Sequence, residues 1–241
     1  MRLDTAVILS AGLGLRMRPL SLATPKPLLK LAGEPILAHV LARLALAGVR
    51  NILVNTHHLA EQVEAFSAGY PGVRVVREAK LLETGGAVAA MLAKNLLPDG
   101  PFYIVNGDSF WADGPSDTLA RLAQAFNPAR MDALLLLVRT AGVAAQTGQG
   151  DFLWPRDGAL QRRGERDVAP YVFAGVQVAS PALFAGAPAA PFSLNLLWDQ
   201  AMARGRLDAV VHDGIWFHLS TPEDLARADA ALAAGEVGNT T

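Results

Sequence analysis

The sequence predicts an α/β fold with a mixed, mainly parallel sheet flanked by helices, and three observations support this prediction. Hydrophobic residues make up 51% of the 241 residues and charged residues only 18%, a balance that permits a large buried core. Short apolar runs alternate with longer helical patterns in the first 140 residues, as in successive β-α-β units. No internal repeat or low-complexity linker divides the chain, so we expect one domain over residues 1–241.

The first half alternates predicted strands and helices. Short apolar runs predict buried strands over residues 5–10, 51–56, 73–77 and 102–105. Helical spacing of apolar residues predicts helices over 35–48, 59–67 and 86–97. Pro35 opens the first of these helices, Gly48 ends it, and Pro98 ends the last. Helices between strands imply crossovers and parallel pairing.

The second half is expected to extend the same sheet. Strand-like runs cover residues 131–140, 171–178, 207–211 and 216–219, and two short hairpin pieces cover 152–154 and 159–161. Helices are predicted over 193–204 and 222–234, the latter with Thr221 as N-cap. Residues 235–241 are expected to form a frayed tail.

Charge and cysteine content exclude several classes of function. With 21 basic and 22 acidic residues, the formal net charge is −1, so no basic field attracts nucleic acid or an anionic membrane. The absence of cysteine excludes a disulfide scaffold, a thiolate zinc site and a cysteine nucleophile. No apolar run approaches the roughly 18 residues of a membrane helix, and residues 6–9 are too short for a signal peptide. We therefore expect a soluble cytoplasmic protein.

A glycine-containing loop after the first strand is the first candidate site. Gly12 and Gly14 would let backbone amides approach a phosphate, although two glycines alone are also typical of a tight turn. Arg16 and Lys26, the latter between Pro25 and Pro27, favour the phosphate interpretation because both are anion ligands. Met17 takes the place of the third glycine of a dinucleotide fingerprint, and no Walker A lysine follows.

These residues resemble the signature of the sugar-1-phosphate nucleotidyltransferases. The resemblance covers residues 9–19, Thr24-Pro-Lys-Pro-Leu28 and Gly33-Glu-Pro35, and continues through residues 82–86, 105–108, 150–152, 173–175 and 216–221. Within the family, residues 82–86 and 150–152 look most like the N-acetylmuramate α-1-phosphate uridylyltransferases, with the mannose-1-phosphate guanylyltransferases next. The resemblance implies a Rossmann-like nucleotide-diphospho-sugar transferase fold, here without the C-terminal β-helix of some members.

The resemblance also implies an enzyme and a role for each matching residue. A sugar 1-phosphate and a nucleoside triphosphate would form an NDP-sugar and pyrophosphate, with residues 1–140 binding mainly nucleotide and 141–234 mainly sugar phosphate. Arg16 would hold the triphosphate and Lys26 would bridge the two substrates. The remaining expected nucleotide ligands are Ala11, Gly12, Gly14 and Leu15 in the loop, and Glu83, Thr84 and Gly85 over the base.

Asp108 is the candidate metal ligand, at the end of the strand that leads into Asn106-Gly107. A carboxylate next to substrate phosphates suits Mg²⁺, with Mn²⁺ as the alternative cofactor, whereas Asn-Gly by itself indicates a turn. By resemblance, Asn106, Asp151 and Gly175 would contact the sugar phosphate. Outside the resemblance, Asp151 would be an ordinary solvated acid of a glycine-rich bend.

One position departs from the family pattern. His218 stands where relatives carry a second metal-binding aspartate, and Ser220 replaces a glycine. Three interpretations stay open: His218 ligates the metal, Asp108 holds it alone with phosphates, or activity is lost. His57 and His58 are expected to be ordinary loop histidines, and Trp111, Trp154 and Trp198 are expected to serve packing more than stacking.

Three functions therefore remain in order of preference. The first is a uridylyltransferase that acts on N-acetylmuramate 1-phosphate in peptidoglycan recycling. The second is the same chemistry on another pair, such as GTP and mannose 1-phosphate. The third is a catalytically silent nucleotide-sugar-binding protein. The expected partners are these small molecules, with no nucleic acid or membrane, and the expected state is a monomer or weak dimer.

Overall fold

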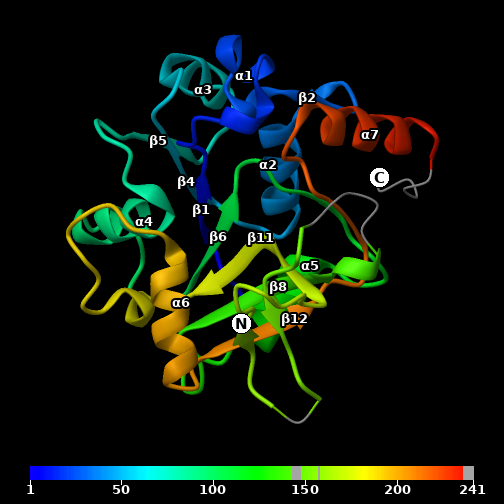
Figure 1. Ribbon diagram of the computed structural model, residues 1–241. Coiled ribbons are helices and arrows are strands. Elements are labelled where there is room, and N and C mark those ends of the chain that lie inside the picture. The colour runs from blue at the N-terminus through cyan, green and yellow to red at the C-terminus, as the bar shows by residue number, and fades with distance from the viewer. Residues whose placement is uncertain (143–147, 157, 236–241) are drawn as a thin grey trace.

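A nine-stranded sheet forms the centre of the molecule in the computed structural model, which describes residues 1–142, 148–156 and 158–235 (Figure 1). Seven strands follow the order β10-β9-β11-β6-β1-β4-β5, and β8 pairs with both β11 and β12. The strands are β1 (Thr5–Leu9), β4 (Asn51–Thr56), β5 (Val73–Arg77), β6 (Phe102–Asn106), β8 (Ala133–Arg139), β9 (Phe152–Leu153), β10 (Gln161–Arg162), β11 (Tyr171–Ala179) and β12 (Leu207–Val211).

The sheet is mixed, as the sequence predicts. Strands β6, β1, β4 and β5 run parallel to one another, and Leu9 lies in register with both Asn55 and Asn106. Strand β11 is antiparallel to β6 and β8, so the second half of the chain continues the sheet of the first. Because β1 leads to β4 on one side and β6 lies on the other, the strand order reverses beside β1. In such sheets the carboxyl ends at this reversal are the usual ligand site.

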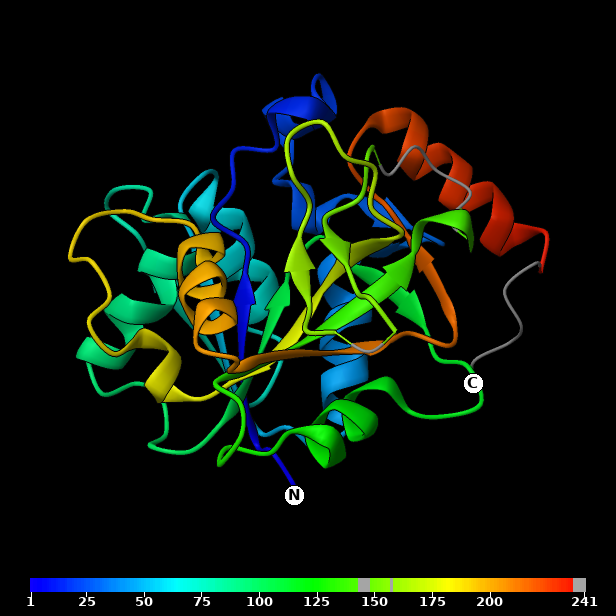
Figure 2. The same cartoon turned by 60° about the horizontal axis from the view of Figure 1, so that its bottom comes forward.

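Helices cover both faces of the sheet and bury its alternating side chains. One face packs on α2 (Ile36–Leu46), α3 (Ala60–Ser67) and α5 (Thr118–Ala125), with Ala6 and Ile8 of β1 in the same core. The opposite face packs on α4 (Glu83–Ala93) and α6 (Leu194–Ala203) together with Val7. Figure 2 shows α4 and α6 together on one side of the sheet. Trp111 and Trp198 lie in these cores, as expected for packing residues.

Several element boundaries differ from the sequence prediction. Helix α4 begins at Glu83 and ends at Ala93, not over 86–97, because Asn95 takes a left-handed backbone conformation (φ 52°) and stops the helix before Pro98. Helix α5 was not expected, although Asp117 caps it by accepting the Ala120 N–H. The expected strand 216–219 is β13 (Ile215–Phe217), which pairs only with β7 (Phe110–Ala112) among the described strands.

The C-terminal helix α7 (Pro222–Ala233) packs on the N-terminal segment that follows β1. Thr221 caps it as predicted and forms a capping box with Asp224. Figure 1 shows α7 beside β2 (Lys30–Leu31), which pairs with β3 (Glu34–Pro35). Met17, Leu29, Leu31, Leu219 and Leu225 share one small core between these segments. The expected tail begins at Gly235, and residues 236–241 lie outside the described residues.

Short helices complete the described part of the chain. They are α1 (Leu20–Ala23) and the 3-10 turns η1 (Leu15–Met17), η2 (Lys26–Leu28), η3 (Thr140–Gly142) and η4 (Pro181–Phe184). None of the helices in the described ranges has the length and apolar character needed to cross a membrane.

Candidate functional site

The loop after β1 is built around Gly14. This glycine has a left-handed backbone (φ 59°), and a Cβ there would lie 3.1 Å from Ser21 Cβ and 3.3 Å from Lys26 Cβ. Ser21 Oγ donates to the Gly14 carbonyl at 2.7 Å, and so does Met17 N–H at 2.9 Å. Gly12 is different, because a Cβ there would meet open space. The loop thus has one glycine that the fold requires and one that faces a cavity.

Lys26 lies opposite Asp108 at the edge of the sheet. Its Nζ is 2.5 Å from Asp108 Oδ2, although 82 positions separate the two in the chain. Buried Pro27 and the extended Pro25 hold η2 so that the Lys26 side chain, only 12% exposed, runs into the cavity beside the loop. Opposite charges at this distance neutralise each other. When a ligand enters the cavity, Lys26 can instead bind an anion and Asp108 a cation.

A cavity of about 360 Å³ contains this pair, and we call it the arginine–lysine cavity. Its lining residues are Leu9, Ser10, Gly12, Gly14, Leu15, Arg16, Lys26, Pro27, Asp108 and Ser220. Within the described residues Arg16 forms no ion pair, so its guanidinium is available to a ligand. Backbone amides and two cations around one hollow can bind a polyphosphate.

A second cavity of about 350 Å³ adjoins the first, and we call it the carboxylate cavity. Its lining residues are Leu9, Ala11, Gly12, Asn55, Glu78, Leu81, Glu83, Thr84, Asn106 and Asp108. Leu9, Gly12 and Asp108 belong to both cavities. The two hollows therefore form one continuous site at the carboxyl ends of β1, β4 and β6.

The start of α4 is fixed by the segment that leads into α6. Gly85 N–H and Gly86 N–H both donate to the Phe192 carbonyl, at 2.9 and 3.1 Å, and Thr84 Oγ1 accepts Leu194 N–H at 2.9 Å. A Cβ on Gly85 would overlap the Phe192 ring. Of the three residues expected over the base, Glu83 and Thr84 line the carboxylate cavity, whereas Gly85 lies against Phe192 and does not line it.

The structure brings two of the three expected sugar-phosphate ligands together. Gly175 (φ 81°) sits in a bulge of β11, and a Cβ there would lie 3.1 Å from Asn106 Nδ2 and overlap Ser109 Oγ. Asp151 lies just before β9, and its Oδ2 accepts the N–H of Phe173 in β11 at 2.8 Å. Asp151 lines neither of the two cavities, although its other carboxylate oxygen has no partner within the described residues.

His218 lies next to the arginine–lysine cavity through Ser220, which lines it. His218 Nε2 is 2.7 Å from Ser220 Oγ, and the imidazole packs 5.6 Å from the Trp216 ring. Burial lowers the pKa of His218, and the nearby Lys26 and Arg16 charges lower it further, against opposing effects of Asp224 and Asp108. The described residues contain no cluster of three or more His, Asp or Glu side chains that could hold a metal alone.

Asn55 and Glu78 belong to the carboxylate cavity but were missed from the sequence. Both are buried, and their side chains are hydrogen-bonded to each other at 2.7 Å. In the sequence, Asn55 resembles an ordinary strand residue and Glu78 a charge after a strand. Only their positions at the carboxyl ends of parallel strands could have indicated a site. His57 and His58 bond to the backbone carbonyls of Glu78 and Ser21.

Comparison with known proteins shows similarity along almost the whole chain. The MobA-like NTP transferase domain matches residues 6–149. N-acetylmuramate alpha-1-phosphate uridylyltransferase of Caulobacter vibrioides is 36% identical over 95% of this chain and 96% of its own. Mannose-1-phosphate guanylyltransferase catalytic subunit beta of Drosophila pseudoobscura pseudoobscura is 30% identical over 91% of this chain but 60% of its own.

A solved structure shows the same fold at low sequence identity. The inositol-1-phosphate CTP transferase from T. maritima superposes with a TM-score of 0.76, covering 100% of this chain and 99% of that one. Its identity is 16%, so this likeness describes the fold alone. It agrees with the mixed, mainly parallel sheet and flanking helices predicted from the sequence.

Proposed function

Because this chain belongs to the sugar-1-phosphate nucleotidyltransferases, within the MobA-like NTP transferase family, we propose that it transfers a uridylyl group from UTP to N-acetylmuramate 1-phosphate. The products are UDP-N-acetylmuramate and pyrophosphate, a reaction suited to peptidoglycan recycling in the cytoplasm. The 36% identity to an enzyme of that name, over 95% of the chain, carries the proposal. The two adjoining cavities support it, because a nucleotide needs a phosphate site beside a base site.

The reaction needs positioning and charge neutralisation more than acid–base chemistry. An oxygen of the sugar phosphate attacks the α-phosphorus of UTP, forming one P–O bond, and the bond to the β-phosphate bridge breaks to release pyrophosphate. The attacking oxygen is already anionic at neutral pH, so no general base is required. We assign Arg16 to the triphosphate and the leaving pyrophosphate, and Lys26 to the space between the α-phosphate and the sugar phosphate.

The residues present fit Mg²⁺ bound with the nucleotide. Mg²⁺ usually takes one or two carboxylates plus substrate phosphates, and Asp108 is a carboxylate in the wall shared by both cavities. Asp108 would hold the ion, which when bound neutralises the phosphates and orients them for in-line transfer. His218 is a weaker candidate ligand, because its Nε2 already faces Ser220 Oγ and a neutral imidazole prefers Mn²⁺ or Zn²⁺.

The remaining expected ligands divide between the base and the sugar. We assign Ala11, Gly12, Glu83 and Thr84 to the nucleoside, since all four line the carboxylate cavity. We assign the backbone of Gly14 and Leu15 to the phosphates, because both residues line the arginine–lysine cavity. Gly85 acts by fixing the start of α4. Asn106 and Gly175 are assigned to the sugar or ribose, and Asp151 to a sugar hydroxyl through its free carboxylate oxygen.

Pyrophosphate release from purified protein tests this function. UTP, GTP, CTP and dTTP would be crossed with the 1-phosphates of N-acetylmuramate, N-acetylglucosamine, glucose and mannose, each with Mg²⁺ and with Mn²⁺. We expect release confined to UTP with N-acetylmuramate 1-phosphate. Release with GTP and mannose 1-phosphate would keep the mechanism and replace the substrates. Silence across the grid, with UTP still binding by calorimetry, would identify a protein that binds nucleotide without catalysis.

A further inference from the structure

A chain of hydrogen bonds crosses the floor of the carboxylate cavity from one loop to the other. Ser10 N–H, at the start of the glycine loop, donates to Asn55 Oδ1 at 2.6 Å. Asn55 Nδ2 donates to Glu78 Oε1 at 2.7 Å, and Leu82 N–H donates to Glu78 Oε2 at 3.0 Å. Leu82 is the N-cap of α4. Two side chains thus join the loop after β1 to the segment that precedes Glu83 and Thr84.

The two side chains of this hydrogen-bond chain are buried, so replacing either one leaves a buried polar group without a partner. Asn55 is 3% exposed and Glu78 7% exposed, and no ion pair within the described residues involves Glu78. A buried carboxylate without a cation is costly unless N–H donors satisfy its oxygens, and here each oxygen has one. The backbone also fixes Glu78, because its N–H donates to the Thr56 carbonyl at 2.8 Å and His57 Nδ1 lies 2.9 Å from its carbonyl oxygen.

The groups at the two ends of this hydrogen-bond chain, Ser10 N–H and Leu82 N–H, determine which side chains can stand between them. Both ends are backbone N–H groups, which only donate, so the side chains between them must present an acceptor at each end. One amide and one carboxylate meet this requirement, in either order, whereas two amides or two carboxylates do not. Two amides lack one acceptor, and two carboxylates face each other without a proton between them.

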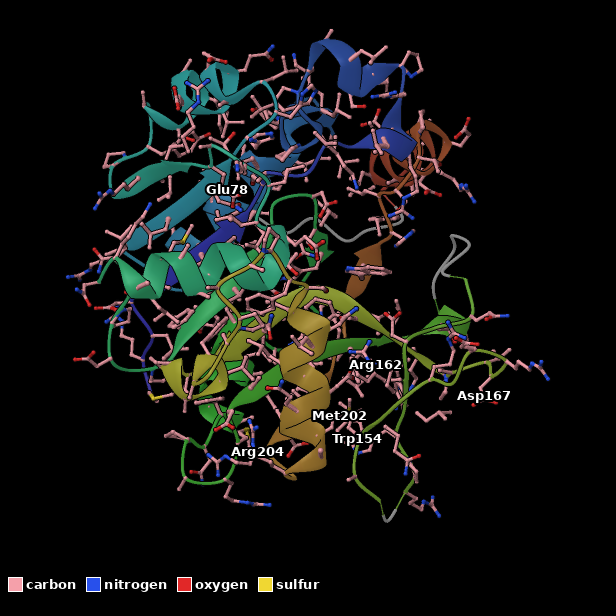
Figure 3. All side chains as sticks on the ribbon, turned by 60° about the vertical axis from the view of Figure 1, so that its left-hand side comes forward. Glu78, Trp154, Arg162, Asp167, Met202 and Arg204 are labelled. Atoms are coloured by element: carbon pink, nitrogen blue, oxygen red, sulfur yellow. The ribbon has the colours of Figure 1, made fainter. Side chains whose placement is uncertain are left out.

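We propose that Asn55 and Glu78 are positioning residues that hold the glycine loop and residues 79–84 in one fixed arrangement, so that the triphosphate and the base of a nucleotide are bound together. The proposal rests on the proposed function for the identity of the ligand. Figure 3 shows Glu78 above α4, well away from Trp154 and Arg162, which lie beside α6. The pair therefore acts on the nucleotide end of the site and not on the part of the fold around β10 and α6.

Exchanging the amide at position 55 with the carboxylate at position 78 tests whether Glu78 positions the two loops or contacts the base directly. The single variants Glu78→Gln and Asn55→Asp each break the chain. The double variant N55D/E78Q reverses its order. The carboxylate now at position 55 accepts from Ser10 N–H and from the amide nitrogen now at position 78, whose amide oxygen accepts Leu82 N–H. All three hydrogen bonds are kept. If Glu78 instead acted by contacting the base through its charge, the double variant would stay as impaired as E78Q.

Calorimetry and amide exchange test the proposal, with N51D on the same strand as the matched control. Loss of a hydrogen bond to a charged group predicts that E78Q binds UTP about tenfold more weakly, and N55D at least as weakly. Tripolyphosphate has no base to place in the carboxylate cavity and should bind E78Q within about twofold of wild type, because Ser10 N–H keeps its partner. Exchange of amides 79–84 in the free protein should be faster in E78Q. Both properties should return in N55D/E78Q to within about threefold of wild type.

Three binding results would overturn the proposal. They are wild-type UTP affinity in E78Q, equal losses of UTP and tripolyphosphate, and a double variant no better than E78Q. Amide exchange does not depend on turnover, so unchanged exchange at 79–84 in E78Q would also overturn it. Failure of the proposed function gives a different result, namely no pyrophosphate release by wild-type protein whatever the exchange pattern. A thermal melt of each variant shows that the comparisons are made on folded protein.

Discussion

The two adjoining cavities differ in charge and in how the chain builds them. The arginine–lysine cavity takes most of its wall from one segment, residues 9–27, and is lined by two cationic side chains, those of Arg16 and Lys26. The carboxylate cavity collects residues from four segments, and the described residues that line it include no lysine or arginine. A triphosphate is common to all nucleotides, while the base differs among them. The first cavity therefore suits affinity that is shared by nucleotides, and the second suits choice among them.

The largest effect on turnover is expected at Lys26, which tests directly whether the arginine–lysine cavity treats all nucleotides alike. Replacing Lys26 with methionine removes one charge-stabilising donor at the reacting phosphates, which typically costs about 10²–10³-fold in turnover. Because the cavity is not selective, kcat/KM should fall by a similar factor for every nucleotide that wild type accepts. Pyrophosphate release measures this, with exposed Lys30→Met as control. A fall for one nucleotide alone would show that Lys26 takes part in base choice.

Gly12 sharpens the comparison because it belongs to both cavities. A Cβ at Gly12 meets no protein atom, so Gly12→Ala should leave the melting temperature unchanged while nucleotide affinity falls about tenfold through steric conflict with the ligand. Gly14→Ala should instead lower the melting temperature, since the left-handed backbone at Gly14 costs alanine about 1–2 kcal/mol of stability. Calorimetry and thermal melts on both variants test this. Destabilised G12A would mean that the loop itself requires this glycine.

The same contrast explains how much of the site could be predicted from the sequence. Gly14, Arg16 and Lys26 lie within thirteen positions of one another, so their residue types and spacing together favoured a phosphate site. Asn55 and Glu78 carry no local signal, because their role depends on hydrogen bonds between distant positions. Ser10 and Asn55 are 45 positions apart, and Asn55 and Glu78 are 23 apart. The order of the strands makes those contacts, and apolar periodicity does not reveal strand order.

The fold shows the same limit at its boundaries. Alternating strands and helices predicted parallel pairing in the first half of the chain, and β6, β1, β4 and β5 confirm it. The early start of α4 depends on the Phe192 carbonyl, which accepts both Gly85 N–H and Gly86 N–H from a segment more than 100 positions away. The strand pairing of β13 with β7 likewise depends on tertiary contact between short segments. Local propensity fixes element type, while distant partners fix where an element begins and ends.

Gly85 tests whether the carboxylate cavity depends on the segment before α6. Gly85→Ala places a methyl group into the Phe192 ring, and overpacking of this kind typically costs about 1–3 kcal/mol. We expect a lower melting temperature together with altered preference among UTP, GTP, CTP and dTTP. Gly100→Ala is the matched control, because a Cβ there meets nothing within 4 Å. An unchanged nucleotide preference in G85A would show that the position of α4 does not determine which base is bound.

His218→Asp tests a smaller effect, at the position beside the arginine–lysine cavity where this chain departs from the family pattern. The variant restores a second carboxylate near Asp108, and Mg²⁺ commonly uses one or two. We expect Mg²⁺-dependent turnover to stay within about threefold of wild type or to rise. Initial rates at matched Mg²⁺ and Mn²⁺ concentrations measure it. A clear loss of activity would show that the histidine, through its contact with Ser220, has a role that a carboxylate does not fill.

The smallest effect is expected at His212, which lines neither cavity and so separates fold stability from ligand binding. Burial lowers the pKa of His212, against weaker opposing effects that begin with its hydrogen bond to the Ile215 carbonyl. The unfolded chain protonates this imidazole near its usual value of about 6.5, whereas the native protein does so only at lower pH. Its contribution to stability is therefore complete above that value and is lost as pH falls below it. Urea midpoints should decline less steeply between pH 7.5 and 5 in His212→Gln than in wild type, with UTP affinity at pH 7.5 unchanged, and identical slopes would assign the decline to other groups.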